Sequence, residues 1–267
     1  MDTLFVLQMN GDGVLDDAAA AVYNAVCFQR WFRGKSPYSC CFSQNGETLS
    51  LTTDCRRQYV VGKDVRRIIP VGSLEFCERF TGKRVTPLNI PAELMDEQFT
   101  HRKCAYIHGN KIADIFPECD KLFVKNADVA KDDTVETGVF DRAYLRALSD
   151  CPSRLFVSEP VDFISEWRCF IYRGKLLYIA CYSGDEWMLP DKQSVIDMTT
   201  AFSSAPDAYT LDVGILSTGG TAVVEVHNFV SCGLYGFGAN NAEDLIHMVI
   251  AGYRNWIEKP ENNKKGC

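Results

Sequence analysis

The sequence lacks several features that would assign it directly to a membrane, secreted or repeat class of protein. No apolar run approaches the roughly 20 residues that a membrane-spanning helix requires. The acidic start "MDTLFVLQMNGDG" and its short apolar run do not resemble a secretory signal peptide. No internal repeat and no low-complexity tract is visible. We therefore expect a globular, cytoplasmic protein with no membrane partner.

A surplus of positive charge is also missing. The 267 residues carry a formal net charge of −7 at pH 7. Binding to nucleic acid normally requires a basic surplus that neutralises phosphate, so no nucleic-acid partner is expected. A local basic cleft is still compatible with this balance. The length suggests about one to three domains that share a sizeable core.

Cysteine is abundant, but the spacing of the cysteines argues against a disulfide framework and against a zinc site. Twelve cysteines are scattered along the chain, the first at Cys27 and the last at Cys267, and no C-x-x-C pair occurs. A chain of this length does not need disulfides, and a zinc site would need closer ligand spacing. Cys40 and Cys41 have no base nearby in the sequence, so no catalytic thiol is predicted. We expect free thiols in a reducing compartment.

The first hundred residues have an α/β pattern. A buried strand is predicted over Thr3–Met9, and a helix with an acidic first turn over Asp16–Phe32. The apolar segment Arg66–Phe80 continues this pattern. The proline-bearing segment Thr81–Phe99 has little periodicity and is predicted to connect two domains. These patterns predict an α/β domain over residues 1–95 that is smaller than the domain after it.

After the connection, strands dominate and most of them are antiparallel. The predicted strands are Lys121–Lys125, Arg154–Phe163, Glu166–Gly174, Lys175–Asp185, Ala208–Leu216 and Thr221–Phe229. Hairpin turns are expected at Gly174 and at the "STGG" segment 217–220. Helices are predicted over Asp141–Asp150 and Asp191–Phe202, with a capped one over Asn241–Lys259.

The polar segment Lys131–Phe140 is predicted to be a mobile loop. Together these patterns predict an α+β domain over residues 96–260, followed by a frayed tail over residues 261–267.

One strand carries residues that are unusual for a buried strand. In "VVEVHNF", Glu225 and His227 are two residues apart, so their side chains lie on one face. Asp212 stands alone among apolar residues on the neighbouring strand. Magnesium is typically held by one or two carboxylates and by substrate phosphates, so these residues are metal-ligand candidates. The alternative is that Asp212 caps a turn and Glu225 pairs with a lysine.

Other charged residues are of the kinds that bind a triphosphate. Lys125 ends a strand, and Glu159 and Glu166 flank "PVDFIS", which is typical of a strand–loop hinge. Arg168 follows two residues later. Cations on one side and metal-binding carboxylates on the other would neutralise and coordinate a triphosphate.

This set resembles the ATP-grasp superfamily. The segments "SEPVDFISEWRCFIYRGKLL" and "LDVGI…VVEVHNFVSCGLYGF" are similar to the clade named for one arginine and two lysines. The resemblance spans residues 122–237, and "IIPVGSLEF" loosely resembles the domain that precedes the ATP-grasp domain. It implies an α+β ATP-grasp fold, with two α+β subdomains that grip ATP, preceded by a smaller α/β domain.

The resemblance also implies roles for individual residues. The cofactors would be ATP and Mg²⁺. The implied nucleotide-binding residues are Lys125, Lys131, Ser158, Glu159, Val161, Glu166 and Arg168. Arg168 and Lys131 would also be catalytic. The implied metal ligands are Asp212, Glu225 and His227.

His227 is a departure from the family pattern. The pattern at the metal glutamate is glutamate, apolar residue, asparagine, and this chain has His227 in the third place, with Asn228 next. Imidazole is a poorer ligand than an amide oxygen for a hard cation. Three readings are open: His227 has a different role, a bulge presents Asn228, or the second metal site is weak.

The implied activity is that of an ATP-dependent carboxylate–amine ligase. ATP would phosphorylate a carboxylate, and an amine would displace phosphate from the acyl-phosphate, with ADP and phosphate as products. The substrates would be small molecules or peptides. The alternatives are an ATP-binding regulatory or interaction module without ligation and a phosphotransferase with the same nucleotide site. The sequence does not indicate an oligomeric state.

Overall fold

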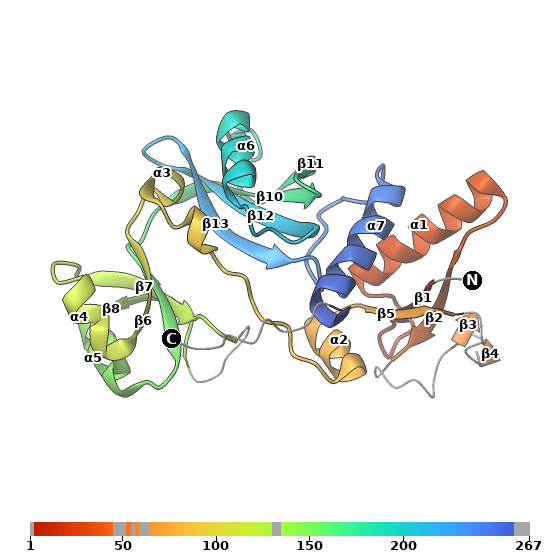
Figure 1. The fold of residues 1–267 in the computed structure, drawn as a ribbon, viewed down its shortest axis with the longest axis horizontal. Coiled ribbons are helices and arrows are strands. Elements are labelled where there is room, and N and C mark those ends of the chain that lie inside the picture. The colour runs from red at the N-terminus through yellow and green to blue at the C-terminus, as the bar shows by residue number, and fades with distance from the viewer. Residues whose placement is uncertain (1–2, 45–51, 55–56, 59–64, 130–134, 259–267) are drawn as a thin grey trace. The chain divides into compact units, whose positions relative to one another are not determined.

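The structure, a computed structural model, divides into two compact units (Figure 1). It describes residues 3–44, 52–54, 57–58, 65–129 and 135–258. The first unit comprises Met1–Val85, Pro206–Tyr209 and Asn228–Cys267, and the second comprises Thr86–Ala205 and Thr210–His227. The domain boundaries proposed from the sequence, at residues 95 and 260, remain a prediction.

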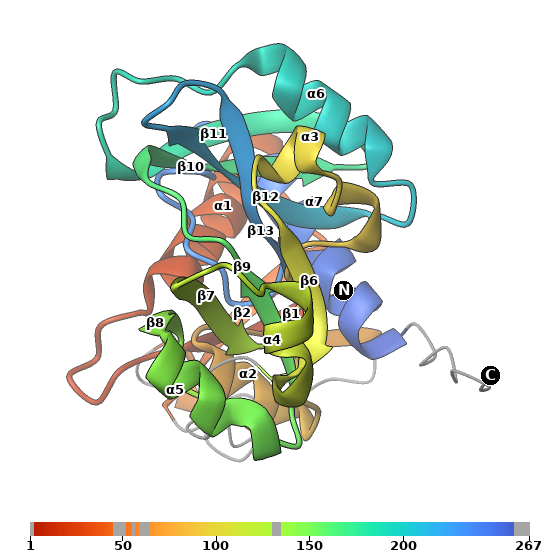
Figure 2. The same ribbon diagram turned by 90° about the vertical axis from the view of Figure 1, so that its left-hand side faces the viewer.

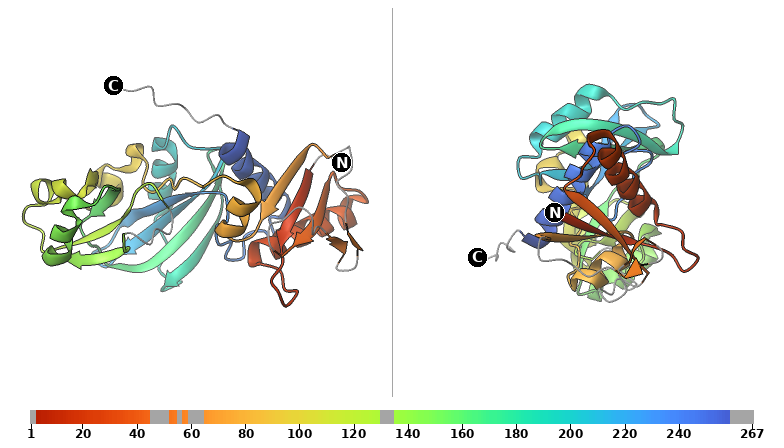
Figure 3. Two further views of the ribbon diagram at one scale, coloured as in Figure 1. Left: turned by 90° about the horizontal axis from the view of Figure 1, so that it is seen from below. Right: turned by 90° about the vertical axis from the view of Figure 1, so that its right-hand side faces the viewer.

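A five-stranded sheet of order β4-β3-β2-β1-β5 forms the centre of the first unit (Figure 3). Its strands are β1 (Thr3–Gln8), β2 (Tyr38–Ser43), β3 (Thr52–Asp54), β4 (Arg57–Gln58) and β5 (Arg67–Val71). β1 pairs in parallel with both β2 and β5. Because a parallel central strand is covered on both faces, its sequence is a continuous apolar run, as "LFVL" is here.

The helices described in this unit are α1 (Asp17–Arg33), α2 (Leu74–Thr81) and α7 (Ala242–Tyr253). Asp16 caps α1 by accepting a hydrogen bond from the Ala18 amide. α1 packs against α7, and Arg33 is 2.8 Å from Glu243. α7 continues into a π-helical turn, Arg254–Glu258. The predicted cap of this last helix is wrong, because the side chain of Asn241 forms no capping hydrogen bond.

The second unit contains two four-stranded sheets. The first has the order β6-β9-β7-β8, and all of its neighbouring strands are antiparallel. Its strands are β6 (Cys104–His108), β7 (Lys121–Asn126), β8 (Gly138–Asp141) and β9 (Arg154–Ser158). The short helices α4 (Ile112–Ile115) and α5 (Arg142–Ala147) lie beside this sheet (Figure 2). Ile112 and Leu145 join strand residues such as Leu122 and Leu155 in one apolar core.

The predicted loop Lys131–Phe140 is only partly supported. Residues 131–134, including Lys131, lie outside the described residues. Gly138–Asp141 forms strand β8, in which Phe140 pairs with Leu122 of β7, so the loop prediction is wrong there. β8 is an edge strand, and edge strands tolerate a polar sequence that hides them from pattern analysis. The Phe140 ring stacks on Tyr144, with centroids 3.9 Å apart.

The second sheet has the order β11-β10-β12-β13. Its strands are β10 (Phe163–Tyr172), β11 (Lys175–Gly184), β12 (Ala208–Leu216) and β13 (Thr221–Asn228). Both predicted hairpin turns are confirmed: one passes through Gly174, with φ of 72°, and the other spans residues 217–220. The predicted strand Arg154–Phe163 is instead divided, because Pro160 interrupts it between β9 and β10.

The second unit also contains further short helical elements. They are η2 (Ala92–Leu94), α3 (Glu97–Thr100), η3 (Gly109–Lys111), η4 (Leu148–Asp150) and α6 (Lys192–Ala201). α6 buries Val195 and Met198. Among the described residues, no helix is long and apolar enough to cross a membrane. The cysteines within those residues are free thiols.

Candidate nucleotide and metal site

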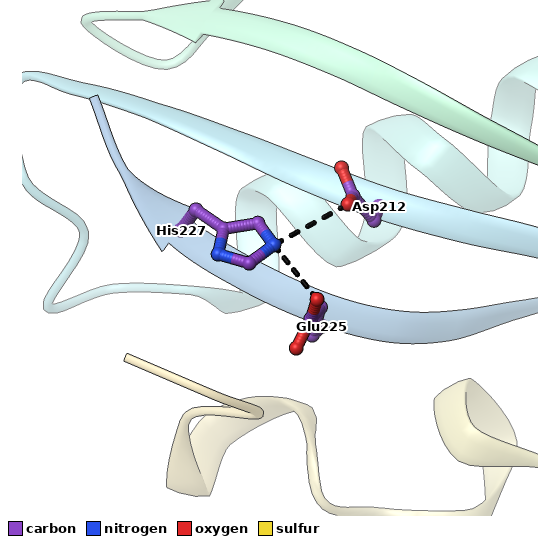
Figure 4. Close-up of side chains that lie close together, drawn as sticks. All are labelled: Asp212, Glu225 and His227. Carbon is purple, nitrogen blue, oxygen red and sulfur yellow. Dashed lines mark ion pairs between the residues drawn. The ribbon is translucent and has the colours of Figure 1, made fainter. Parts of the chain in front are cut away.

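The three predicted metal ligands lie together on two neighbouring strands of the second unit (Figure 4). Asp212 comes from β12, and Glu225 and His227 come from β13. One ligand atom from each residue lies within 4.8 Å of the others. His227 Nε2 is 2.8 Å from Glu225 Oε1 and 3.5 Å from Asp212 Oδ2. The short turn after β12 sets the register that brings these side chains together.

Asp212 is held by an arginine from the adjacent strand β10. Arg168 donates from Nε to Asp212 Oδ1 at 2.9 Å and from Nη2 to Oδ2 at 2.7 Å. Both residues are buried, with exposed fractions of 8% for Arg168 and 1% for Asp212. A bidentate contact of this kind fixes the orientation of a buried carboxylate. Asp212 therefore does not cap a turn, which was the alternative that the sequence left open.

Glu225 has two partners of opposite charge. Lys125 Nζ donates to Glu225 Oε2 at 2.6 Å, so the pairing with a lysine that the sequence left open does occur. Burial opposes ionisation of Glu225, but His227 and Lys125 outweigh it and hold the pKa of Glu225 well below its usual range. Burial also disfavours a charged imidazole, yet Asp212 and Glu225 raise the pKa of His227 to about 9.

The donor set fits a divalent cation. His227 Nε2 is buried and, among the residues that the structure describes, has no partner in hydrogen-bond geometry, although two carboxylates face it. A ring nitrogen placed between two carboxylates requires a proton or a metal ion on it. Carboxylate oxygens are ligands that Mg²⁺ accepts together with substrate phosphates. Asp212, Glu225 and His227 are therefore the residues that could hold the metal, and the ring of His227 contributes to the cluster.

A cavity of about 330 Å³ lies beside this cluster, and its lining comes from both sheets of the second unit. The predicted site residues that line it are Lys125, Ser158, Glu159, Val161, Glu166 and Glu225. Arg168 is not among the lining residues. Pockets for small ligands and cofactors are commonly about 300–1,000 Å³. The structure thus brings most of the predicted nucleotide residues to one cavity.

An ATP-grasp domain family, the second family of the clade named for one arginine and two lysines, matches residues 99–245. The chain belongs to this family. The predicted superfamily, clade and fold are therefore confirmed. The ATP-grasp match contains both sheets of the second unit, the three-residue cluster and the cavity.

Several solved structures have a similar fold. Macrocyclase MdnC from Microcystis aeruginosa MRC, bound with precursor peptide MdnA, has a TM-score of 0.58 at 10% identity, covering 92% of this chain and 100% of its own. ATP-grasp ligase PsnB, complexed with a minimal precursor, has a TM-score of 0.55 at 13% identity, covering 92% of this chain and 99% of its own.

N5-carboxyaminoimidazole synthetase from Staphylococcus aureus has a TM-score of 0.53 at 11% identity, covering 94% of this chain and 77% of its own. Identities this low show the fold alone. No curated protein matches the sequence significantly.

The predicted hinge is tied to Lys103, the residue that precedes β6. The Glu159 amide donates to the Lys103 carbonyl at 3.0 Å, and Glu159 Oε2 accepts from the Lys103 amide at 2.9 Å. Pro160 has no N–H, so Val161 provides the next backbone donor after Glu159. Ser158, at the end of β9, is buried. The Glu159 side chain therefore fixes the backbone at the start of the predicted hinge.

Arg102 lines the same cavity and was missed in the sequence. Its exposed fraction is 8%, and Nη1 donates to the carbonyls of Thr100 and Val223 at 3.0 Å each. Burial lowers the pKa of Arg102, and no acidic side chain within the described ranges forms an ion pair with it. A buried charge without a counter-charge is costly, so this guanidinium points to an anionic ligand. Its segment, "THRKC", has no periodicity that would reveal it.

Aromatic rings also line the cavity: Phe123, Phe156 and Phe163. Lys125 Nζ lies 5.5 Å from the centroid of the Phe156 ring. Gly214 makes room for Phe163, because a Cβ at this position would overlap that ring. Phe123 could have been found in the sequence, since it is two residues from Lys125 on one strand and shares its face. Phe163 could not, because its placement depends on the distant Gly214.

Replacing His227 by asparagine should keep or raise activity with Mg²⁺, and it should weaken competition by Ni²⁺. An amide oxygen suits the hard Mg²⁺ ion, whereas imidazole favours Ni²⁺. Steady-state assays at fixed Mg²⁺ with increasing Ni²⁺ measure this. Unfolding of His227→Asn, with no change in the metal preference of the folded fraction, would instead indicate a purely structural histidine.

Proposed function

We propose that this protein is an ATP-dependent carboxylate–amine ligase that forms an amide bond through an acyl-phosphate and releases ADP and phosphate. The observation that carries the proposal is the position of Glu225. Its carboxylate belongs to the three-residue cluster and also lines the cavity. A cation held by the cluster would therefore adjoin the phosphates of a nucleotide in the cavity.

The lining residues support a nucleotide in a defined orientation. The aromatic rings and the backbone after Glu159 would hold adenine, and Glu166 would bind the ribose. Lys125 and Arg102 are the cations that line the cavity within the described chain, and they would bind the phosphates. Arg168 is bonded to Asp212, so we assign it the placement of this carboxylate in addition to its predicted role at the phosphoryl group. The roles of Lys131 remain a proposal on the resemblance.

The chemistry follows from these placements. A carboxylate oxygen of the substrate attacks the terminal phosphorus, and the bond to ADP breaks. The amine nitrogen then attacks the acyl carbon, loses a proton, and phosphate leaves. Mg²⁺, when bound, supplies charge neutralisation at the phosphates. The protein contributes placement and fixed positive charge, which stabilise the transferring group without a covalent enzyme intermediate.

One observation favours a second candidate, an ATP-binding module without ligation. His227 occupies the position where the family has asparagine, and its ring takes part in the cluster. A weaker hold on Mg²⁺ would leave nucleotide binding intact and slow turnover. A phosphotransferase with the same site would differ in the bond that its product contains.

Product analysis tests the ligase. Amino acids and short peptides, offered in pairs with MgATP, should include a combination that releases phosphate. Phosphorus NMR should then show ADP and inorganic phosphate, and mass spectrometry should show an amide product. Pyrophosphate with AMP would refute the acyl-phosphate route. A phosphorylated product without an amide would favour the phosphotransferase, and ATP binding without any turnover would favour the module.

MgATP should raise the melting temperature, because a ligand that binds only the folded state stabilises it. At 100-fold over its dissociation constant, the stabilisation is about 2.7 kcal/mol. GTP should have a smaller effect, since the hinge backbone would read adenine. In Arg102→Met, the advantage of ATP over adenosine should shrink because a phosphate contact is lost. Equal shifts with ATP and GTP would argue against the hinge assignment.

A further inference from the structure

Strands β10 and β11 contain a β-bulge beside the proposed nucleotide site. Glu166 pairs with Ser183, but the next residue, Trp167, pairs with Cys181. Tyr182 is therefore the extra residue on β11. A bulge changes the local direction of the strand and of its side chains, and bulges are frequent next to active sites.

The side chain of Tyr182 reaches two residues of the site. Its hydroxyl donates to Glu166 Oε2 at 2.7 Å. The guanidinium carbon of Arg168 lies 5.6 Å from the centroid of its ring, within the range of a cation–π contact. Arg168 in turn holds both oxygens of Asp212. One side chain thus contacts both the carboxylate that faces the cavity and the arginine that supports the metal cluster.

The phenol of Tyr182 remains a hydrogen-bond donor at any ordinary pH. Burial raises its pKa above the usual range, and the charges of Asp212, Glu166 and Glu225 act in the same direction. The contact with Glu166 is therefore between a neutral hydroxyl and a carboxylate, and the hydroxyl occupies Oε2. The other oxygen, Oε1, can then accept from a ligand in a fixed orientation.

We infer that Tyr182 is a positioning residue with two separable effects. Its hydroxyl orients Glu166 toward a ribose hydroxyl, and its ring supports Arg168 and hence Asp212. The inference rests on the proposed function in that Glu166 is taken to bind the ribose. It goes beyond that function by assigning nucleotide selectivity to a residue that does not line the cavity.

The two effects can be separated by two substitutions. Tyr182→Phe keeps the ring and removes only the hydroxyl, whereas Tyr182→Leu removes both contacts. Tyr178→Phe is a matched control on the same strand, where the ring lies 5.9 Å from that of Phe170. Calorimetry should measure the binding of MgATP, its 2′-deoxy analogue and its 3′-deoxy analogue, together with the Mg²⁺ concentration for half-maximal ATP binding. Melting curves confirm that each variant is folded.

The wild type should bind ATP about 10-fold more tightly than the deoxy analogue whose missing hydroxyl Glu166 contacts, as expected for a hydrogen bond to a charged group. In Tyr182→Phe this ratio should fall to about 3-fold or less through loss of ATP affinity, with the Mg²⁺ requirement unchanged. Tyr182→Leu should lose selectivity and also need several-fold more Mg²⁺. Tyr178→Phe should match the wild type.

A wild-type ratio in Tyr182→Phe would overturn the inference while the ligase proposal stands. Equal binding of ATP and both deoxy analogues by the wild type would overturn the role of Glu166 and the inference with it. A wild type that binds no adenine nucleotide would overturn the proposed function as well. Because Tyr182→Phe preserves shape, the inference can be tested even where Tyr182→Leu fails to fold.

Discussion

Replacing Asp212 by asparagine should lower the free energy of unfolding by about 3–5 kcal/mol, the usual cost of removing one partner from a buried ion pair. The change leaves Arg168, of which only 8% is exposed, without its counter-charge. Turnover should also be lost, because a proposed metal ligand is removed. Urea denaturation at pH 7 measures the first effect, and phosphate release at a temperature where the variant is folded measures the second.

A double variant separates the two effects of Asp212. Arg168→Met combined with Asp212→Leu removes both charges and places an apolar side chain at each position. Replacing a buried ion pair by apolar residues is often neutral or stabilising. We expect its stability to return close to that of the wild type while it remains inactive. Wild-type stability in Asp212→Asn alone would contradict the buried pair, and activity in the double variant would contradict the metal role.

The proximity of Asp212, Glu225 and His227 could be predicted because local rules determine it. The two-residue period of a strand places Glu225 and His227 on one face, and the short turn at 217–220 brings Asp212 alongside. The same rules did not reveal that Arg168 holds Asp212. That contact depends on β10 pairing with β12, and these strands are separated in sequence by β11 and α6.

The cavity was harder to predict, because its walls come from segments that are far apart in sequence. The resemblance implied a hinge role for Glu159, but it did not reveal that its partner is the Lys103 amide, 56 residues away. Arg102 carries no local signal, since an arginine in a turn is usually a solvated surface residue. Only the packed structure reveals that this one is buried and lines the cavity.

Strand β8 shows a different limit of sequence reasoning. Its four residues are polar or partly exposed, because an edge strand has a neighbour on one side only. The pairing of Phe140 with Leu122 and its stacking on Tyr144 keep the strand in place. These contacts arise from tertiary structure and cannot be read from the local pattern. The loop prediction was therefore wrong for the residues of β8.

Replacing Glu225 by glutamine should reduce turnover by about 10²–10³-fold, the typical loss when one electrostatic contact at a transition state is removed. The isosteric amide preserves shape but removes the negative charge that would hold the metal next to the phosphates. Stability should fall less than in Asp212→Asn, because the Glu225 side chain is 29% exposed and water can replace part of its contact with Lys125.

The matched variant Lys125→Met distinguishes metal binding from phosphate binding. In Glu225→Gln, a higher Mg²⁺ concentration should restore part of the activity by mass action, and ATP should still raise the melting temperature through Lys125 and Arg102. In Lys125→Met, added Mg²⁺ should give no such recovery, because the missing group is a cation that binds phosphate. Initial rates over a range of Mg²⁺ concentrations measure both responses. Near-normal turnover in Glu225→Gln would contradict the metal assignment. Equal Mg²⁺ rescue of the two variants would show that Glu225 and Lys125 do not act on different parts of the bound nucleotide.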